Sequence, residues 1–90
     1  MLCTVCGSEP ATMNFGAICC SSCKMFFRRN EYFDFQNSKC RFSMMCNIQK
    51  DNRRTCRYCR LSKCFSIGMK QELFVVVVFM IHYFYHKEKK

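Results

Sequence analysis

Apolar side chains recur with a helical period in the chain from residue 21 onward. Cys23, Phe26 and Phe27 fall on one side of a repeat of about 3.6 residues, and a serine stands where an N-cap would begin the helix. The other side is broad and mixes small, basic and thioether side chains: Ser21, Lys24, Met25, Arg28 and Arg29. The pattern predicts a helix over about residues 21–32, with an aromatic back that closes a small core and a basic front.

A second stretch of helical character follows Cys56. It runs from Arg57 to Phe65 and stops before Gly68, a residue type that commonly ends helices. Cys64 falls among the apolar positions of this stretch, so we expect a small buried hydrophobic side chain there and not a metal ligand. The pattern predicts a second helix over these residues.

The end of the chain is patterned differently. An uninterrupted apolar run of nine residues from Leu73 to Ile81 becomes thirteen if it is continued to Tyr85. This is short of the ~20 apolar residues that span a bilayer, so we do not expect a membrane anchor. The β-branched and aromatic side chains favour a strand, and four consecutive valines disfavour the alternative of a helix. We expect residues 70–90 to form an atypical apolar tail with a basic end.

A chain of 90 residues makes one small domain, which buries too little surface to be stable without further cross-links. Its ten cysteines are candidates for disulfides or for metal ligands. No basic segment followed by an apolar stretch opens the chain, so we expect no secretory signal and a reducing compartment. In such a compartment thiols bind metal more often than they form disulfides.

The charge of the chain is strongly basic. Fifteen Lys and Arg residues oppose six Asp and Glu residues, which gives a formal net charge of +9. Such an excess attracts polyanions, with nucleic acid first and anionic membrane second, and it exceeds the ~2–8 charges that keep a small domain soluble. Two four-thiolate zinc sites, each with a formal charge of about −2, would lower it to about +5, which is still basic.

Eight of the cysteines divide into two groups with the spacing of zinc ligands. The first group is two CxxC pairs separated by thirteen residues, and the second is spaced by five, nine and two residues. The predicted ligands of two Zn²⁺ ions are Cys3, Cys6, Cys20 and Cys23 in the first site and Cys40, Cys46, Cys56 and Cys59 in the second. A closed four-thiolate site has no open position for water or substrate, so both metals should be structural.

No arrangement of residues points to an enzyme. The acidic residues are scattered, both histidines lie in the apolar tail, and there is no glycine-rich phosphate loop. Cys19 lies outside both groups of ligands. It could compete with its neighbour Cys20 for zinc, but we expect it to be a spare thiol.

The basic front of the first predicted helix suits a DNA groove. A major groove about 12 Å wide admits a helix, and Lys24, Arg28 and Arg29 could each donate to guanine O6 or N7. The alternative is an ordinary solvated face. Three arginines flank the second cysteine group and are predicted to contact phosphates: Arg53, Arg54 and Arg60. Their contribution should weaken strongly with salt.

Longer motifs connect the two cysteine groups to one known family. They read Cys3-x-x-Cys6-Gly7, Asn14-Phe15-Gly16-Ala17, Cys20-x-x-Cys23-Lys24-x-Phe26-Phe27-Arg28-Arg29, Cys56-x-x-Cys59-Arg60-Leu61-x-Lys63-Cys64 and Gly68-Met69. From Cys3 to about Met69 the chain resembles the nuclear-receptor DNA-binding domain. We therefore expect a domain over residues 1–69, with a first finger over residues 3–23 and a second over residues 40–59.

The resemblance implies a small α plus irregular, metal-stabilised domain. It would consist of two loop-zinc-helix modules whose helices pack near perpendicular, with the first helix in the major groove and the second supporting it. The resemblance also implies zinc-dependent, sequence-specific binding of double-stranded DNA by a transcription factor in the nucleus, as a homodimer or heterodimer.

The same resemblance implies roles for particular positions. The residues that select the DNA half-site are Ser21, Ser22 and Met25, and those that contact bases or phosphates are Lys24, Arg28 and Arg29. The dimerisation loop is Arg41, Phe42, Ser43, Met44 and Met45. The family usually has Glu and Gly at positions 21 and 22 and a small residue at position 25. The half-site preference of the family therefore cannot be transferred to this chain.

Two other functions remain open at this point. The apolar tail stands where the family has a hinge and a ligand-binding domain, so no small-molecule ligand can be inferred. A truncated receptor could act instead as a protein-interaction or dominant-negative module. The ten thiols could also buffer metal or redox state, although their ordered spacing disfavours this.

Overall fold

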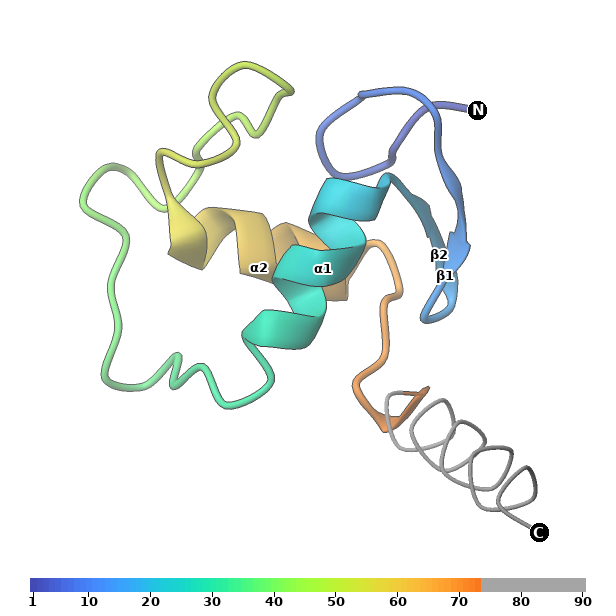
Figure 1. Cartoon of the computed structure of the whole chain (residues 1–90). Coiled ribbons are helices and arrows are strands. Elements are labelled where there is room, and N and C mark those ends of the chain that lie inside the picture. Colours follow the sequence, from blue (N-terminus) through green and yellow to red (C-terminus); the bar gives the residue numbers. More distant parts are fainter. Residues whose placement is uncertain (74–90) are drawn as a thin grey trace, which may run out of the picture.

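The computed structural model describes residues 1–73, in which two short strands precede two helices. The strands are β1 (Thr12–Asn14) and β2 (Ala17–Cys19), and the helices are α1 (Ser21–Arg29) and α2 (Arg57–Ser66). The two helices cross and pack against each other, with the hairpin on one side of them and the long loop between α1 and α2 on the other (Figure 1). The predicted fold class, a small α plus irregular domain with two cysteine-bearing modules, is confirmed.

α1 begins at Ser21, as predicted, but its cap is Cys20 and not Ser21. Cys20 Sγ accepts a hydrogen bond from the backbone N–H of Cys23 at 3.4 Å. The helix is shorter than predicted because Asn30 ends it, with its backbone N–H 3.2 Å and its Nδ2 2.7 Å from Phe26 O. At the other end of α1, the hydrogen bond from Cys23 fixes the Cys20 sulfur next to the first turn.

α2 is built in the same way. Cys56 Sγ accepts a hydrogen bond from the backbone N–H of Cys59 at 3.4 Å. The helix ends where it was predicted to end, because Gly68 adopts a φ of 105° and the N–H of Met69 donates to Cys64 O at 3.1 Å. Cys64 is 0 % exposed, which confirms the prediction of a buried side chain.

An aromatic core joins the two helices. Phe27 of α1 is 0 % exposed and its ring lies 5.1 Å from that of Phe65 in α2, edge to face. The ring of Phe15, in the hairpin, lies 6.0 Å from the ring of Phe27. Each such pair contributes ~0.5–1.5 kcal/mol beyond the burial of its area. The predicted aromatic back of α1 is confirmed at Phe27, whereas Phe26 is half-buried beneath the guanidinium of Arg60.

The hairpin of β1 and β2 is an element that the hydrophobic pattern does not predict. Asn14 pairs with Ala17, which leaves Phe15 and Gly16 as a two-residue turn with φ values of 53° and 97°. Positive φ at both positions is the geometry of a type I′ turn, whose twist matches that of the strands. Each strand has only three residues, too few for an alternating pattern to stand out.

The tip of the hairpin docks on the segment that follows α2. The backbone N–H of Lys70 donates to Phe15 O at 2.8 Å. A Cβ at Gly16 would lie 3.1 Å from Gly68 O and 3.6 Å from the Leu73 side chain, which packs against the core. The two chain segments can approach this closely only because position 16 has no side chain.

We expect Gly16→Ala to lower the free energy of unfolding by about 2–3 kcal/mol, because it adds strain at a positive φ and pushes on the carbonyl of Gly68. Gly7→Ala is the matched control, since Gly7 also has a positive φ, 79°, but nothing within 4 Å of a new Cβ. It should cost only about 1 kcal/mol. Urea unfolding at a fixed, saturating zinc concentration measures both changes, and equal losses would show that the contact with Gly68 is unimportant.

The last described residues turn back onto the domain. Gln71 Nε2 donates to Glu31 O at 3.0 Å, just beyond the end of α1. Beyond Leu73, the predicted apolar tail lies outside the described residues. Within residues 1–73 no helix has the length and apolar character needed to cross a bilayer.

Candidate zinc centres and nucleic-acid interface

The first centre is formed by an N-terminal turn and the start of α1. Its four sulfurs lie within 4.8 Å of one another and all four residues are buried: Cys3, Cys6, Cys20 and Cys23. The turn is closed by the backbone N–H of Gly7, which donates to Cys3 O at 2.8 Å. Cys3 Sγ accepts from the N–H groups of Val5 and Cys6, both at 3.4 Å. These hydrogen bonds fix the position of the Cys3 sulfur at the centre.

The second centre is formed by the loop after α1 and the start of α2. Its four sulfurs also lie within 4.8 Å of one another: Cys40, Cys46, Cys56 and Cys59. Cys40 Sγ is 3.5 Å from the sulfurs of Cys46 and Cys56 and 3.6 Å from that of Cys59. Cys40 and Cys46 are half-buried, so this centre is nearer to solvent than the first.

The geometry of both centres fits zinc. Zn–S bonds of about 2.3 Å place the sulfurs of a tetrahedral site roughly 3.8 Å apart, whereas a disulfide needs about 2.05 Å. The sulfur separations of 3.5 to 3.7 Å agree with the tetrahedral edge, and all ten cysteines are free thiols. A zinc ion held by four thiolates cross-links the chain and has no open coordination position for a reaction.

The thiols of a centre do not all ionise by themselves. Burial alone would raise the pKa of Cys6, but hydrogen bonds with Ser8 and Arg53 outweigh it and bring that pKa to about 6. Burial and the neighbouring Cys40 raise the pKa of Cys46 to about 12. Four close thiolates repel one another, so a bound divalent cation is needed to ionise the whole set.

Two arginines of the second module reach the first centre. Arg53 Nη1 donates to Cys6 Sγ at 3.4 Å, and Arg60 Nη2 donates to Cys23 Sγ at 3.2 Å. The ring of Phe26 lies 4.3 Å below the Arg60 guanidinium. Both arginines offset the negative charge of the thiolates and tie the two modules together.

The exposed face of α1 carries part of the predicted DNA-reading set. Ser21, Arg28 and Arg29 are exposed, and Met25 is 41 % exposed. Lys24 and Ser22 are half-buried. The structure thus presents Ser21, Met25 and Arg28 outward and turns Ser22 toward the second module.

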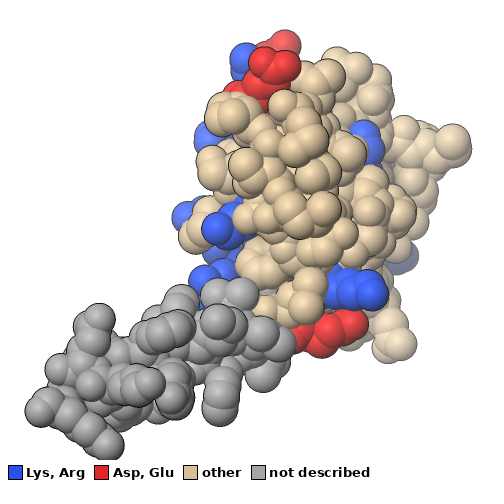
Figure 2. All heavy atoms as spheres, turned by 90° about the vertical axis from the view of Figure 1, so that its right-hand side faces the viewer, with Lys and Arg blue, Asp and Glu red and all other residues tan. Residues whose placement is uncertain are grey.

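A cleft of about 290 Å³ opens where α1 meets the second module. Seven residues line it: Ser22, Phe26, Arg29, Arg53, Arg54, Arg57 and Arg60. We call it the arginine cleft, because five of its lining residues are arginines and none is acidic. In Figure 2, Lys and Arg gather mainly along the left-hand edge, the side from which Figure 1 is viewed, and uncharged side chains fill most of the face shown. This concentration of charge suits a polyanion.

Residues 1–71 match the family model described as double treble clef zinc finger, C4 type. The chain belongs to this family of nuclear-receptor DNA-binding domains. Both zinc centres lie inside the matched residues. The predicted family is therefore confirmed, and the two four-cysteine clusters agree with the prediction of two structural zinc ions. Members of the family are DNA-binding transcription factors and not enzymes.

Several nuclear receptors are similar to this nuclear-receptor domain. Nuclear hormone receptor family member nhr-14 of Caenorhabditis elegans is 49 % identical over 70 residues, which are 78 % of this chain and 16 % of the relative. Hepatocyte nuclear factor 4-alpha of Xenopus laevis and hepatocyte nuclear factor 4-gamma of Homo sapiens are each 49 % identical over 71 residues, 79 % of this chain. Those residues are 15 % and 17 % of the two relatives, so the chain spans only about a sixth of their length.

The nuclear-receptor domain buries most of Arg60, one of the predicted phosphate contacts. Arg60 is 5 % exposed, and its guanidinium is enclosed between Cys23 and Phe26. Its Nε finds no acceptor among the residues that the structure describes. Arg60 therefore supports the first zinc centre, and its predicted phosphate contact stays a prediction. Arg53 is half-buried and Arg54 is exposed, so the same prediction remains for them.

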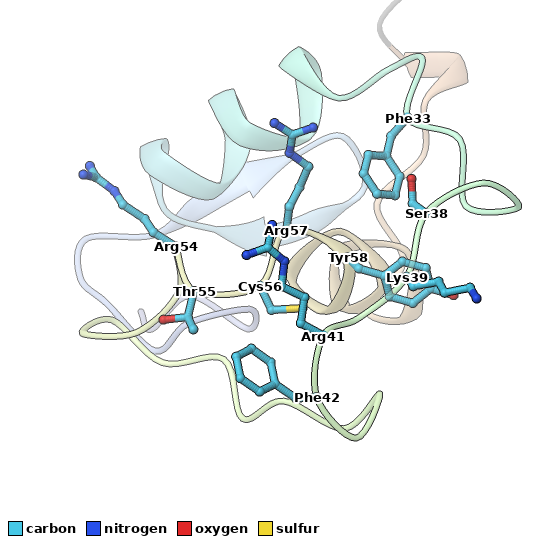
Figure 3. A pocket seen from close by; sticks show the side chains of 10 residues that line it. All are labelled: Phe33, Ser38, Lys39, Arg41, Phe42, Arg54, Thr55, Cys56, Arg57 and Tyr58. Atoms are coloured by element: carbon cyan, nitrogen blue, oxygen red, sulfur yellow. The ribbon is translucent and has the colours of Figure 1, made fainter.

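The predicted dimerisation loop of the nuclear-receptor domain is exposed throughout, from Arg41 to Met45. Phe42 is 61 % and Met45 86 % exposed. Arg41 and Phe42 also line a pocket of about 530 Å³ on the second module. Figure 3 shows its ten side chains, with the guanidinium of Arg54 reaching outward. The pocket contains no acidic residue.

Cys19 and Cys64 lie outside both zinc centres, as expected for both. Both are 0 % exposed. Burial raises the pKa of the Cys64 thiol to about 12 and also raises that of Cys19. A buried neutral thiol is a small apolar side chain, and Cys19 acts as one in β2.

Proposed function

We propose that this domain binds a half-site of double-stranded DNA with α1 in the major groove. The observation that carries the proposal is the juxtaposition of an exposed helix face with the arginine cleft. Ser21, Met25 and Arg28 would face base edges, with Lys24 and Arg29 beside them. Arg53 and Arg54 would hold phosphates and fix the register of the helix. Acting on DNA as a transcription factor, the protein would work in the nucleus.

The side chains suggest which base edges could be read. Arg28 can donate two hydrogen bonds to guanine O6 and N7, and Met25 offers an apolar contact for a thymine methyl group. Phosphate contacts carry no sequence information but dominate the salt dependence. Selection of preferred duplexes by the zinc-loaded protein would reveal the half-site. The absence of any preferred duplex would contradict sequence-specific binding, and capture of a protein without DNA would favour the interaction module.

We expect Arg28→Ala to weaken binding to the preferred duplex by about 5- to 150-fold, equivalent to ~1–3 kcal/mol, and to relax preference at one base pair. Lys63→Ala, which removes one positive charge from α2, is the control and should leave that preference unchanged. Fluorescence anisotropy on the selected duplex and on its single-base variants measures both. If Arg28→Ala weakened all duplexes equally, Arg28 would contact phosphate and not a base.

The exposed loop supports a second, compatible activity, which is pairing on DNA. Phe42, Met44 and Met45 are more than half exposed, an unusual grouping of apolar side chains on a small charged domain. We propose that this loop meets the same loop of a second copy on an adjacent half-site. Two half-sites at a fixed spacing among the selected duplexes would support pairing, and single half-sites would contradict it.

A further inference from the structure

Ser22 makes a contact that sets it apart from the other side chains predicted to read DNA. Its Oγ accepts a hydrogen bond from Arg53 Nη2 at 3.1 Å. The two residues are 31 positions apart and belong to different modules. Ser22 is half-buried and lines the arginine cleft, whereas the neighbouring Ser21 is exposed.

Helical geometry explains the difference between the two serines. Residues 22, 26 and 29 of α1 form one stripe, and all three line the arginine cleft. Ser21 and Met25 belong to the next stripe, which faces outward. The Ser22 hydroxyl is therefore directed to a guanidinium of the second module and away from the surface that would meet base edges.

The guanidinium of Arg53 is held from three sides. Nη1 donates to Cys6 Sγ at 3.4 Å and lies 3.5 Å from Ser8 Oγ, while Nη2 donates to Ser22. An arginine has five N–H donors in a rigid plane, so three acceptors fix the plane and leave donors for another group. A fixed guanidinium loses less entropy when it binds a phosphate than a free side chain does.

We propose that Ser22 is a positioning residue that holds Arg53 for a backbone phosphate at the arginine cleft, and that it does not read a base. This inference rests on the proposed binding of DNA. Ser22 then contributes to binding of the DNA phosphate backbone and not to selection of the base sequence. Its hydroxyl affects how tightly all duplexes bind and not which duplex is preferred. The sequence-reading part of α1 is then limited to its outward stripe.

The test compares Ser22→Ala with wild-type protein, both loaded with two zincs as counted by native mass spectrometry. We expect Ser22→Ala to raise Kd by about three- to tenfold on the selected duplex and on a scrambled duplex alike. The slope of log K against log salt should become shallower by up to about 0.9, the value of one phosphate contact. Ser22→Thr keeps the hydroxyl and should stay within about twofold of wild type.

Ser21→Ala is the matched control, because it removes the same hydroxyl one residue earlier from the exposed stripe. It should leave the salt slope unchanged. NMR of the arginine guanidinium groups tests the contact without DNA, since rotation of the Arg53 guanidinium should be faster in Ser22→Ala. A changed base preference with an unchanged salt slope in Ser22→Ala would overturn the inference. Wild-type protein that binds no duplex would instead refute the proposed function, even if the Arg53 contact were present.

Discussion

Cys20→Ala is expected to leave the protein unfolded at 25 °C and bound to no more than one zinc. Cys20 provides one sulfur of the first centre, and the same sulfur caps α1 through the N–H of Cys23. Zinc binding by finger peptides supplies ~10–16 kcal/mol, which is comparable to or larger than the ~5–15 kcal/mol that stabilises a whole domain. Loss of one ligand of four therefore removes more free energy than the remaining core can replace.

Cys19→Ala is the matched control for this change, because Cys19 is the adjacent residue and is also buried, at 0 % exposure against 5 % for Cys20. It should keep two zincs and lose only about 1 kcal/mol of unfolding free energy. Native mass spectrometry gives the zinc count, and circular dichroism with and without a chelator gives the helix content. Two tightly bound zincs in Cys20→Ala, or one zinc in Cys19→Ala, would show that Cys19 is a ligand in place of Cys20.

The zinc ligands and both helices could be predicted from the sequence because their constraints are local. A CxxC turn brings two sulfurs together within four residues, and each closing pair lies at the start of a helix. Gly68 likewise marks the end of α2 by its own conformation. The helical spacing of apolar positions after Cys56 likewise separated Cys64 from the ligands. Features of this kind depend on few neighbouring residues and can be predicted without knowledge of the tertiary structure.

The features that could not be predicted depend on contacts between distant segments. The hairpin turn at Phe15 and Gly16 is stabilised by Phe27 and by the backbone of Lys70, far along the chain. Arg60 follows directly after a zinc ligand in the sequence, but only the crossing of α1 and α2 directs its guanidinium to Cys23. An arginine beside a cysteine ligand has the same sequence pattern whether it faces solvent or a thiolate.

These contacts make the proposed DNA surface dependent on zinc. Arg53 and Arg60 both donate to sulfurs of the first centre, and both line the arginine cleft beside α1. Removal of the first zinc would release the thiolates to which the two guanidiniums are bound. The cleft and the reading helix should therefore be lost together and not one after the other.

Arg60→Ala should lower the free energy of unfolding by about 3–5 kcal/mol, because it leaves Cys23 without its buried guanidinium partner and Phe26 without the group that covers its ring. Thermal unfolding at fixed zinc concentration measures the change. Arg57→Ala is the matched control on the same helix. Arg57 is exposed and lies 5.9 Å from the ring of Phe33, so its loss should cost only about 0.5–1 kcal/mol.

The same pair of variants decides between the two roles considered for Arg60. If Arg60 supports the zinc centre, Arg60→Ala unfolds at a much lower temperature than Arg57→Ala and releases zinc to a chelator faster. DNA affinity measured well below the melting temperature should then fall alike on every duplex because the cleft is distorted. If Arg60 contacted a phosphate, Arg60→Ala would keep the wild-type melting temperature and zinc release and would change only the affinity and its salt slope. The burial of Arg60 at 5 % exposure and its hydrogen bond to Cys23 Sγ favour the first outcome.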